Sequence, residues 1–399
     1  MRAIERLTLS AYGMHAADQI AIAAVPLLAA VLFGVSPEII GILVACQALA
    51  HLLGSIPFGL IVDRAQARWA AVAAASISAL GFAGAAIGVY ALSLVFFAAS
   101  VTVAGFGIVL FVLVGLSMIP MVVEIKDIAT ANSRVEMARA IPSLAAPLLV
   151  GLLVEYGFGN GLFILAAVVA ATSLAIAFRF PSLEVSHPKK ANVLKTILDG
   201  SRFVVRQRLL RPIAACAVFW NLAFAALLAI LAPLLLDYYH ADPKAFGIAL
   251  SAFGGAVIAG TWVAGRFNRS IAPYVILLLG PGSSFAAVLL LLAIPADGSM
   301  LGLYVIFFFV GFGPSMWLVA QNSIRQLVTP QHMLGCVNAV IQTAIYGVRP
   351  LGALAGGFVT GVLSPTMGVV FVIAAFGCSF AAALFSPLRS VQSFAALRA

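Results

Sequence analysis

Charged residues are scarce in this chain of 399 residues: they make up 9% of it, and hydrophobic residues make up 63%. Because a soluble globular protein carries roughly 25% charged residues, this composition excludes a water-soluble fold. The chain also has no Gly-Lys-Ser/Thr sequence, which excludes an ATP-binding P-loop. Its four cysteines lie in apolar segments without Cys-x-x-Cys spacing, as is typical of small hydrophobic side chains. We therefore expect no cofactor and no metal site.

The apolar residues form twelve blocks, each of about twenty residues, the length that crosses a hydrocarbon core of about 30 Å as an α-helix. The blocks lie at 8–33, 38–61, 69–90, 93–119, 134–156, 158–180, 212–236, 244–265, 272–294, 299–322, 335–361 and 366–386. Apolar positions within them follow a helical period, which argues against a β-barrel. The sequence predicts an all-α polytopic membrane protein with twelve transmembrane helices.

The basic residues predict the orientation of these helices. With a cytoplasmic N-terminus, nineteen of the 22 Lys and Arg residues lie on the inner side and only Lys244 on the outer side. The excess of basic residues on the cytoplasmic side predicts that both termini are cytoplasmic, in a bacterial-type cytoplasmic (inner) membrane. Since the charges are scattered over short loops, the net charge of +9 does not indicate a nucleic-acid partner. We expect a monomer in the lipid bilayer.

An internal repeat divides the chain into two halves. A polar segment at 181–211, predicted to be a cytoplasmic linker, separates an N-terminal six-helix bundle at 1–180 from a C-terminal one at 212–399. At a shift of 206 residues, Pro37 matches Pro243, Gly41 matches Gly247, Gly59 matches Gly265, Asn132 matches Asn338 and Gly151 matches Gly357. Two pseudo-symmetric halves are typical of secondary transporters, which bind substrate between them near the midplane of the membrane and work by alternating access.

The segment GLIVDRAQAR at 59–68 resembles the loop signature of the major facilitator superfamily. Gly59, Asp63, Arg64 and Arg68 match that pattern, and the resemblance implies that they latch a cytoplasmic gate. The segments at 119–133, 198–212 and 328–357 are similar to the drug- and siderophore-exporting branch, which includes the enterobactin exporter and macrolide efflux proteins. That branch implies antiport, although its glycine-rich signature on the fifth span is kept only at Pro147 and Gly151.

Polar side chains recur at three- and four-residue steps within three spans, so each set lies on one helical face. Ionisable groups inside a membrane usually face a cavity or a partner. The candidates for the lining of a substrate and proton cavity are His15, Asp18 and Gln19 in the first span, Gln47 and His51 in the second, Arg139 in the fifth, and Gln342, Tyr346 and Arg349 in the eleventh.

Asp18 is the strongest of these candidates, because a charged Asp at the centre of a membrane helix costs roughly 2.5–3.5 kcal/mol. Burial favours its protonated form and water access favours its ionised form, so we interpret it as a proton carrier. The alternative is a structural pair with Arg349 or His15. Arg349 suits a carboxylate-bearing or siderophore-like substrate. The histidines are alternatively packing residues, and Gln47 alternatively makes a hydrogen bond between helices.

Together these features predict a secondary active transporter, not an enzyme, that exports a small amphipathic molecule such as a siderophore, drug or polar metabolite in exchange for protons. A proton-coupled importer of a small metabolite remains an alternative, as does a non-transporting membrane receptor. A membrane enzyme would need a nucleophile and base on one loop, and only the cluster around Asp237, His240 and Asp242 comes near that.

Overall fold

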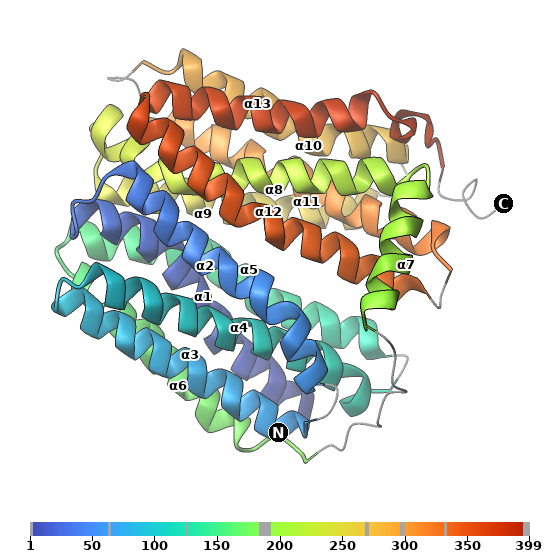
Figure 1. The fold of residues 1–399 in the computed structure, drawn as a ribbon, viewed down its shortest axis with the longest axis horizontal. Coiled ribbons are helices and arrows are strands. Elements are labelled where there is room, and N and C mark those ends of the chain that lie inside the picture. The colour runs from blue at the N-terminus through green and yellow to red at the C-terminus, as the bar shows by residue number, and fades with distance from the viewer. Residues whose placement is uncertain are drawn as a thin grey trace. The chain divides into compact units, whose positions relative to one another are not determined.

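The structure is a computed structural model that describes residues 3–62, 65–124, 127–182, 193–267, 271–295, 300–330 and 333–393. Every regular element within these ranges is helical (Figure 1). The long helices are α1 Ala3–Val31, α2 Pro37–Val62, α3 Ala67–Tyr90, α4 Leu94–Val122, α5 Ile128–Glu155, α6 Leu162–Ala177, α7 Val193–Arg206, α8 Leu210–Pro233, α9 Pro243–Phe267, α10 Pro273–Leu289, α11 Met300–Val328, α12 Leu334–Val362 and α13 Pro365–Leu384. Short helical segments are η2 Gly159–Gly161, η3 Leu234–Tyr238, η4 Leu290–Ala293 and η6 Pro387–Ser390.

Eleven of the described helices are long and apolar enough to cross a membrane. The twelfth predicted span is α12, whose 29 residues equal α1 in length. It is not among these eleven helices, and its sequence carries the polar side chains of Asn338, Gln342, Tyr346 and Arg349. The twelve predicted blocks therefore correspond to α1–α6 and α8–α13, and α7 is an additional helix inside the segment that we predicted as a linker.

Proline, serine and glycine mark the helix ends. Proline is the first residue of α2, α9, α10 and α13, where its missing N–H needs no partner. Ser364 caps α13 by accepting a hydrogen bond from the backbone N–H of Met367 at 3.2 Å. Gly34 follows α1 with a φ of +57°, a conformation that glycine adopts without a steric penalty. These residues mark the end of α1 and the starts of α2, α9, α10 and α13.

The helices fall into two compact units. Unit 1 contains Met1–Ser36, Ile42–Lys189 and Asp242–Ser251, and unit 2 contains Pro37–Gly41, Lys190–Ala241 and Ala252–Ala399. In unit 1, α3 packs on α4 and α6, and α1 packs on α5 and α6. In unit 2, α10 packs on α11 and α13, and α8 packs on α12 and α13. Each pair in unit 1 thus has its repeat-equivalent pair in unit 2.

The repeat extends to individual hydrogen bonds. In unit 1 the hydroxyl of Ser173 donates to the carbonyl of Ser10 at 2.9 Å. In unit 2 the hydroxyl of Ser379 donates to the carbonyl of Cys216, also at 2.9 Å. Both residues of the second bond lie 206 positions after those of the first, the shift that aligns the two halves of the sequence. The pseudo-symmetry of the two bundles therefore includes these serine hydrogen bonds.

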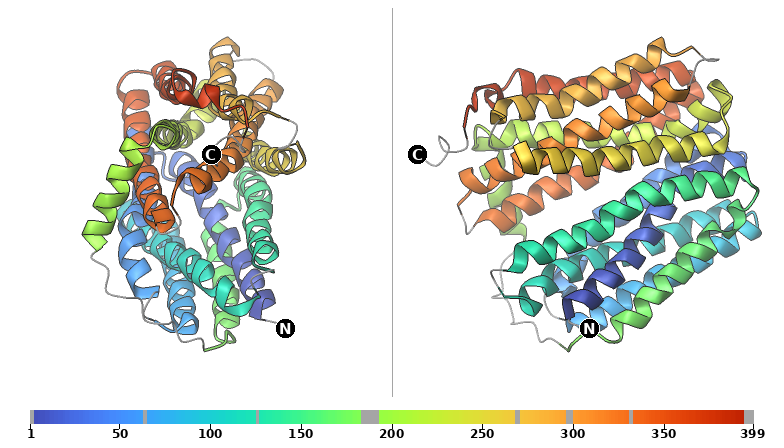
Figure 2. Two further views of the ribbon diagram at one scale, coloured as in Figure 1. Left: turned by 90° about the vertical axis from the view of Figure 1, so that its right-hand side faces the viewer. Right: turned by 180° about the vertical axis from the view of Figure 1, so that it is seen from behind.

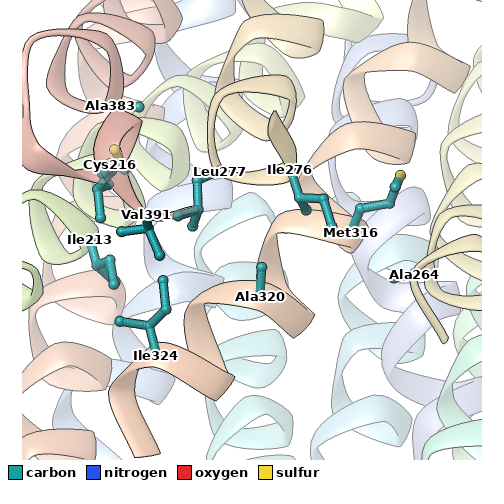
Figure 3. Packing of buried hydrophobic residues seen from close by; sticks show 11 residues of the cluster. Ile213, Cys216, Ala264, Ile276, Leu277, Met316, Ala320, Ile324, Ala383 and Val391 are labelled. Atoms are coloured by element: carbon teal, nitrogen blue, oxygen red, sulfur yellow. The ribbon is translucent and has the colours of Figure 1, made fainter. Parts of the chain in front are cut away.

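The C-terminal segment completes the apolar core at one end of unit 2. Ile213, Ile276, Leu277 and Ile324 come from α8, α10 and α11, and each is at most 1% exposed. Val391, beyond η6, packs into the same cluster (Figure 3), and its carbonyl accepts a hydrogen bond from the backbone N–H of Tyr274 at 3.0 Å. This contact fixes the chain after α13 against the start of α10.

Candidate functional site

Asp18 lies at the middle of the 29-residue helix α1 and is half-buried, as is Gln19. His15, one turn earlier on α1, is only 7% exposed. Thr8 and Tyr12 lie nearer the start of α1 and line an open pocket of about 290 Å³. The polar face predicted for the first span therefore has a buried part at His15 and a part that opens into a pocket.

Residues of both α1 and α5 line that pocket. Its lining residues are Glu5, Thr8, Leu9, Tyr12 and Arg134. Further along α5, Arg139 lies close enough to His15 to act on it electrostatically. Arg139 also forms an ion pair with Glu136 at 3.9 Å, with both side chains mostly exposed. Unit 1 thus brings His15 and Arg139 near each other on facing helices.

Unit 2 has a corresponding pair on α8 and α12. The guanidinium Nε of Arg349 donates to the side-chain oxygen of Asn221 at 2.9 Å, and the Asn221 amide donates to the carbonyl of Ala217 at 2.9 Å. Arg349 also lies over the ring of Tyr346, 5.5 Å from its centroid, a distance at which cation and ring attract each other. These contacts hold the guanidinium in one orientation.

Asn221 was not among the residues predicted from the sequence. It is 8% exposed, and it stands 206 positions after His15, so the two residues occupy equivalent places in the repeat. Both are buried on the first helix of their bundle, and both lie near an arginine of the fifth helix. The repeat shift was the signal that identifies Asn221.

A group of aromatic rings in unit 2 begins at Trp220, the residue before Asn221 on α8. Trp220 stacks on Phe224 with their centroids 5.0 Å apart, and Phe224 stacks on Phe253 at 4.7 Å. The indole N–H of Trp220 donates to the hydroxyl of Ser284 at 3.0 Å. Unit 2 therefore contains a positioned cation at Arg349 and a group of stacked rings on α8 and α9.

Among the polar residues of α2, Ser55 makes a hydrogen bond within its own helix. Gln47 and His51 are both half-buried, and the hydroxyl of Ser55 donates to the carbonyl of His51. Close to Gln47, α4 packs tightly on α2, since a methyl group added to Gly105 would lie 2.8 Å from the Cβ of Ala50. On α12, Gln342 is exposed. The roles of these side chains in a cavity stay predictions.

The predicted gate motif is described in part, because Asp63 and Arg64 lie outside the described residues. Arg68 is half-buried, and its guanidinium lies 5.4 Å from the ring centroid of Trp69. Trp69 in turn packs edge-on against Phe178, with centroids 6.4 Å apart. A methyl group added to Gly59 would meet nothing within 4 Å. The gating role of the motif stays a prediction.

The glycines that the repeat aligns lie at two close helix crossings. In unit 1, a methyl group added to Gly247 would lie 3.0 Å from the Cα of Gly151. In unit 2, a methyl group added to Gly41 would lie 3.1 Å from the Cα of Gly357. Near the first crossing, Lys244 forms an ion pair with Glu155 at 3.5 Å. Such small residues allow helix backbones to approach each other closely.

Twelve long helices in two repeated units, with ionisable side chains on their polar faces, define a polytopic membrane protein of the transporter class. The sequence profile of the Major Facilitator Superfamily matches residues 7–353, and the chain belongs to this family. It is therefore a multi-pass membrane transporter for a small molecule. This role is consistent with the prediction that the protein is not an enzyme. Within the described residues, no three His, Cys, Asp or Glu side chains are grouped so that they could hold a metal ion.

Curated relatives include enterobactin exporters. The protein from Escherichia coli is 24% identical over 225 residues, which cover 56% of this chain and 53% of the relative. The protein from Shigella boydii is 25% identical over the same lengths. The chain thus matches about half the length of these relatives.

Solved transporter structures share the fold over almost the whole chain. The nucleoside transporter NupG has a TM-score of 0.76 at 13% identity. The match covers 96% of this chain and 98% of the NupG chain. The D-xylose–proton symporter has a TM-score of 0.73 at 15% identity, covering 98% of both chains. At this identity the likeness shows the fold alone.

Proposed function

We propose that this transporter is a secondary active exporter that exchanges a small amphipathic molecule for protons by alternating access. The observation that carries the proposal is the position of Asp18, a half-buried carboxyl group at the middle of α1. A carboxyl group at the centre of a membrane helix is costly unless it faces a cavity or a partner. We infer that Asp18 takes up a proton when the site is open to one side and releases it when open to the other.

The energy source is the proton gradient. One charge that moves inward through the membrane yields about 2.3 kcal/mol per 100 mV. That free energy is available for each proton that Asp18 carries, so no nucleotide or other cofactor is required. His15, on the same helix, and Arg139, which acts on it, are placed to influence this proton exchange.

We propose that Arg349 binds the substrate. Its Nε donates to the side-chain oxygen of Asn221, and its guanidinium lies over the ring of Tyr346. A guanidinium held in one orientation suits a carboxylate or another planar anion. The ring of Tyr346 beside the guanidinium suits an aromatic or apolar part of the same molecule. A siderophore fits this chemistry, and the enterobactin exporters among the relatives support it.

The proposed setting is the bacterial cytoplasmic membrane with both termini inside, and the working unit is a monomer without a nucleic-acid partner. The bias of nineteen basic residues to one predicted side supports this orientation. Gly59, Asp63, Arg64 and Arg68 are the proposed cytoplasmic gate, and Gln19, Gln47, His51 and Gln342 the proposed cavity lining.

Proton release from everted membrane vesicles tests this function. The vesicles are acidified inside, and enterobactin, ethidium or D-xylose is added outside while a pH-sensitive dye reports the lumen. We expect enterobactin to release protons from the lumen, because it enters in exchange for them. Proton release that requires substrate preloaded in the lumen would instead indicate a symporter.

The Asp18→Asn variant tests the proton carrier, since Asn has nearly the same shape and cannot ionise. We expect proton release to disappear, while exchange of labelled against unlabelled substrate without a pH gradient persists. Asp127→Asn is the matched control, because Asp127 is exposed and its side chain does not cap α5. Proton-driven transport that survives in Asp18→Asn would contradict the role of Asp18.

A further inference from the structure

Helix α7 lies across the ends of two membrane-spanning helices of unit 2. Figures 1 and 2 show it running crosswise to α8 and α12, and it packs on both. Gly200 lies so close to α12 that an added methyl group would be 3.1 Å from Val340. Val204, at 5% exposure, belongs to a buried cluster with Leu210, Val337 and Ile341. One face of α7 is therefore fixed to the ends of α8 and α12.

The opposite face combines apolar and basic side chains. Leu198 is 49% exposed and Val205 is 63% exposed. Arg202 and Arg206 are exposed as well, and steps of four, seven and eight residues from Leu198 place all four side chains on one side of the helix. Leucine and valine at such exposure, on the same face as two arginines, are unusual for a face that meets only water.

The positive charge continues into the start of α8. Arg208 and Arg211 are both exposed and lie beside the junction of α7 and α8. Within the described ranges, none of the four arginines forms an ion pair. Among the described side chains of α7, Asp199 is the one exposed carboxylate. The net charge of this surface is strongly positive.

We propose that this surface binds the headgroups of anionic phospholipids. It consists of Leu198, Arg202, Val205, Arg206, Arg208 and Arg211, and we name it the α7 face. The helix α8, which is long and apolar enough to cross a membrane, begins four residues after α7 ends, so this position puts the α7 face at the level of the lipid headgroups in our proposal. The guanidinium groups pair with phosphate oxygens, and Leu198 and Val205 enter the boundary of the acyl chains. Basic residues clustered beside a membrane span favour this ligand.

Lipid binding by the whole purified chain tests the proposal. The protein in neutral detergent is titrated with phosphatidylglycerol or phosphatidylcholine, and bound lipid is counted by native mass spectrometry. We expect Arg202→Gln/Arg206→Gln to weaken phosphatidylglycerol binding about tenfold and to leave phosphatidylcholine binding unchanged. The matched control is Arg266→Gln/Arg389→Gln, which removes two exposed charges outside the α7 face.

Two further outcomes decide the proposal. Leu198→Ser/Val205→Ser keeps every charge, and we expect it also to weaken phosphatidylglycerol binding, because the apolar contact with the acyl chains is lost. An equal loss in the Arg266/Arg389 control would show a general charge effect and overturn the α7 face as the site. Wild-type binding in either variant of the α7 face would overturn it too. Neither readout depends on the transported substrate or on proton coupling.

Discussion

At the scale of single residues, the contacts of Arg349 show how a bundle can hold a cation inside a membrane helix. Asn221 supplies an amide oxygen, and Tyr346 supplies the face of a ring. The amide of Asn221 is in turn fixed by the carbonyl of Ala217. Each group in this chain of contacts positions the next one, so a change at Asn221 should alter the position of Arg349.

Replacing Asn221 by leucine tests this positioning. We expect Asn221→Leu to lower the free energy of unfolding by about 1–3 kcal/mol, because Arg349 loses a buried hydrogen-bond partner. Asn221→Asp keeps an oxygen at the same place and should cost less. Unfolding in SDS, followed by tryptophan fluorescence, measures the effect. In a double-mutant cycle with Arg349→Gln the two changes should not add, and strict additivity would contradict the contact.

The sequence predicted Arg349 and Tyr346 but not Asn221, and the reason is physical. The polar residues of α12 recur at helical steps, so they indicate a polar face. Asn221 is a single polar residue in an apolar block, and such a residue has no period. Only the packing of α8 on α12 and the equivalence with His15 reveal its role.

At the scale of elements, all twelve predicted blocks correspond to helices, and within the described ranges α7 is the one long helix that the sequence analysis did not predict. Long apolar blocks are easy to recognise because their length matches the membrane. Residues 181–211 are polar on average, so their mean polarity does not reveal the amphipathic period of α7. Val193, Ile197 and Val204 follow steps of four and seven residues within that segment. A test of periodicity, rather than of mean polarity, would have found α7.

Glycine has two different roles on α12. A methyl group added to Gly356 would lie 2.8 Å from the Cα of Ala226 on α8, whereas one added to Gly335 would meet nothing within 4 Å. We expect Gly356→Ala to lower the free energy of unfolding by about 1–3 kcal/mol through overpacking. Gly335→Ala should raise it by up to about 1 kcal/mol, because alanine favours a helix. Unfolding in SDS measures both, and the same sign for both would contradict this difference in packing.

At the scale of the whole molecule, the two bundles share more than their topology. The packing of α1 on α5 and α6 is repeated by α8 on α12 and α13, and the serine bonds between these helices are repeated as well. The two bundles differ in the polar residues of their cores, with His15 and Asp18 in the first and Asn221 in the second. The repeated packing gives both bundles the same fold. Their polar residues differ, and in our proposal unit 1 exchanges protons and unit 2 binds the substrate.

The repeated serine bonds allow a quantitative test of this symmetry. We expect Ser173→Ala and Ser379→Ala each to cost about 0.6 kcal/mol, the average for a hydrogen bond between membrane helices. Because the two bonds lie in different units and share no partner, the double variant should cost their sum. Ser117→Ala is the matched control, since its hydroxyl bonds to Val114 within the same helix. If one replacement cost several times the other in SDS unfolding, the bundles would not be equivalent at these bonds.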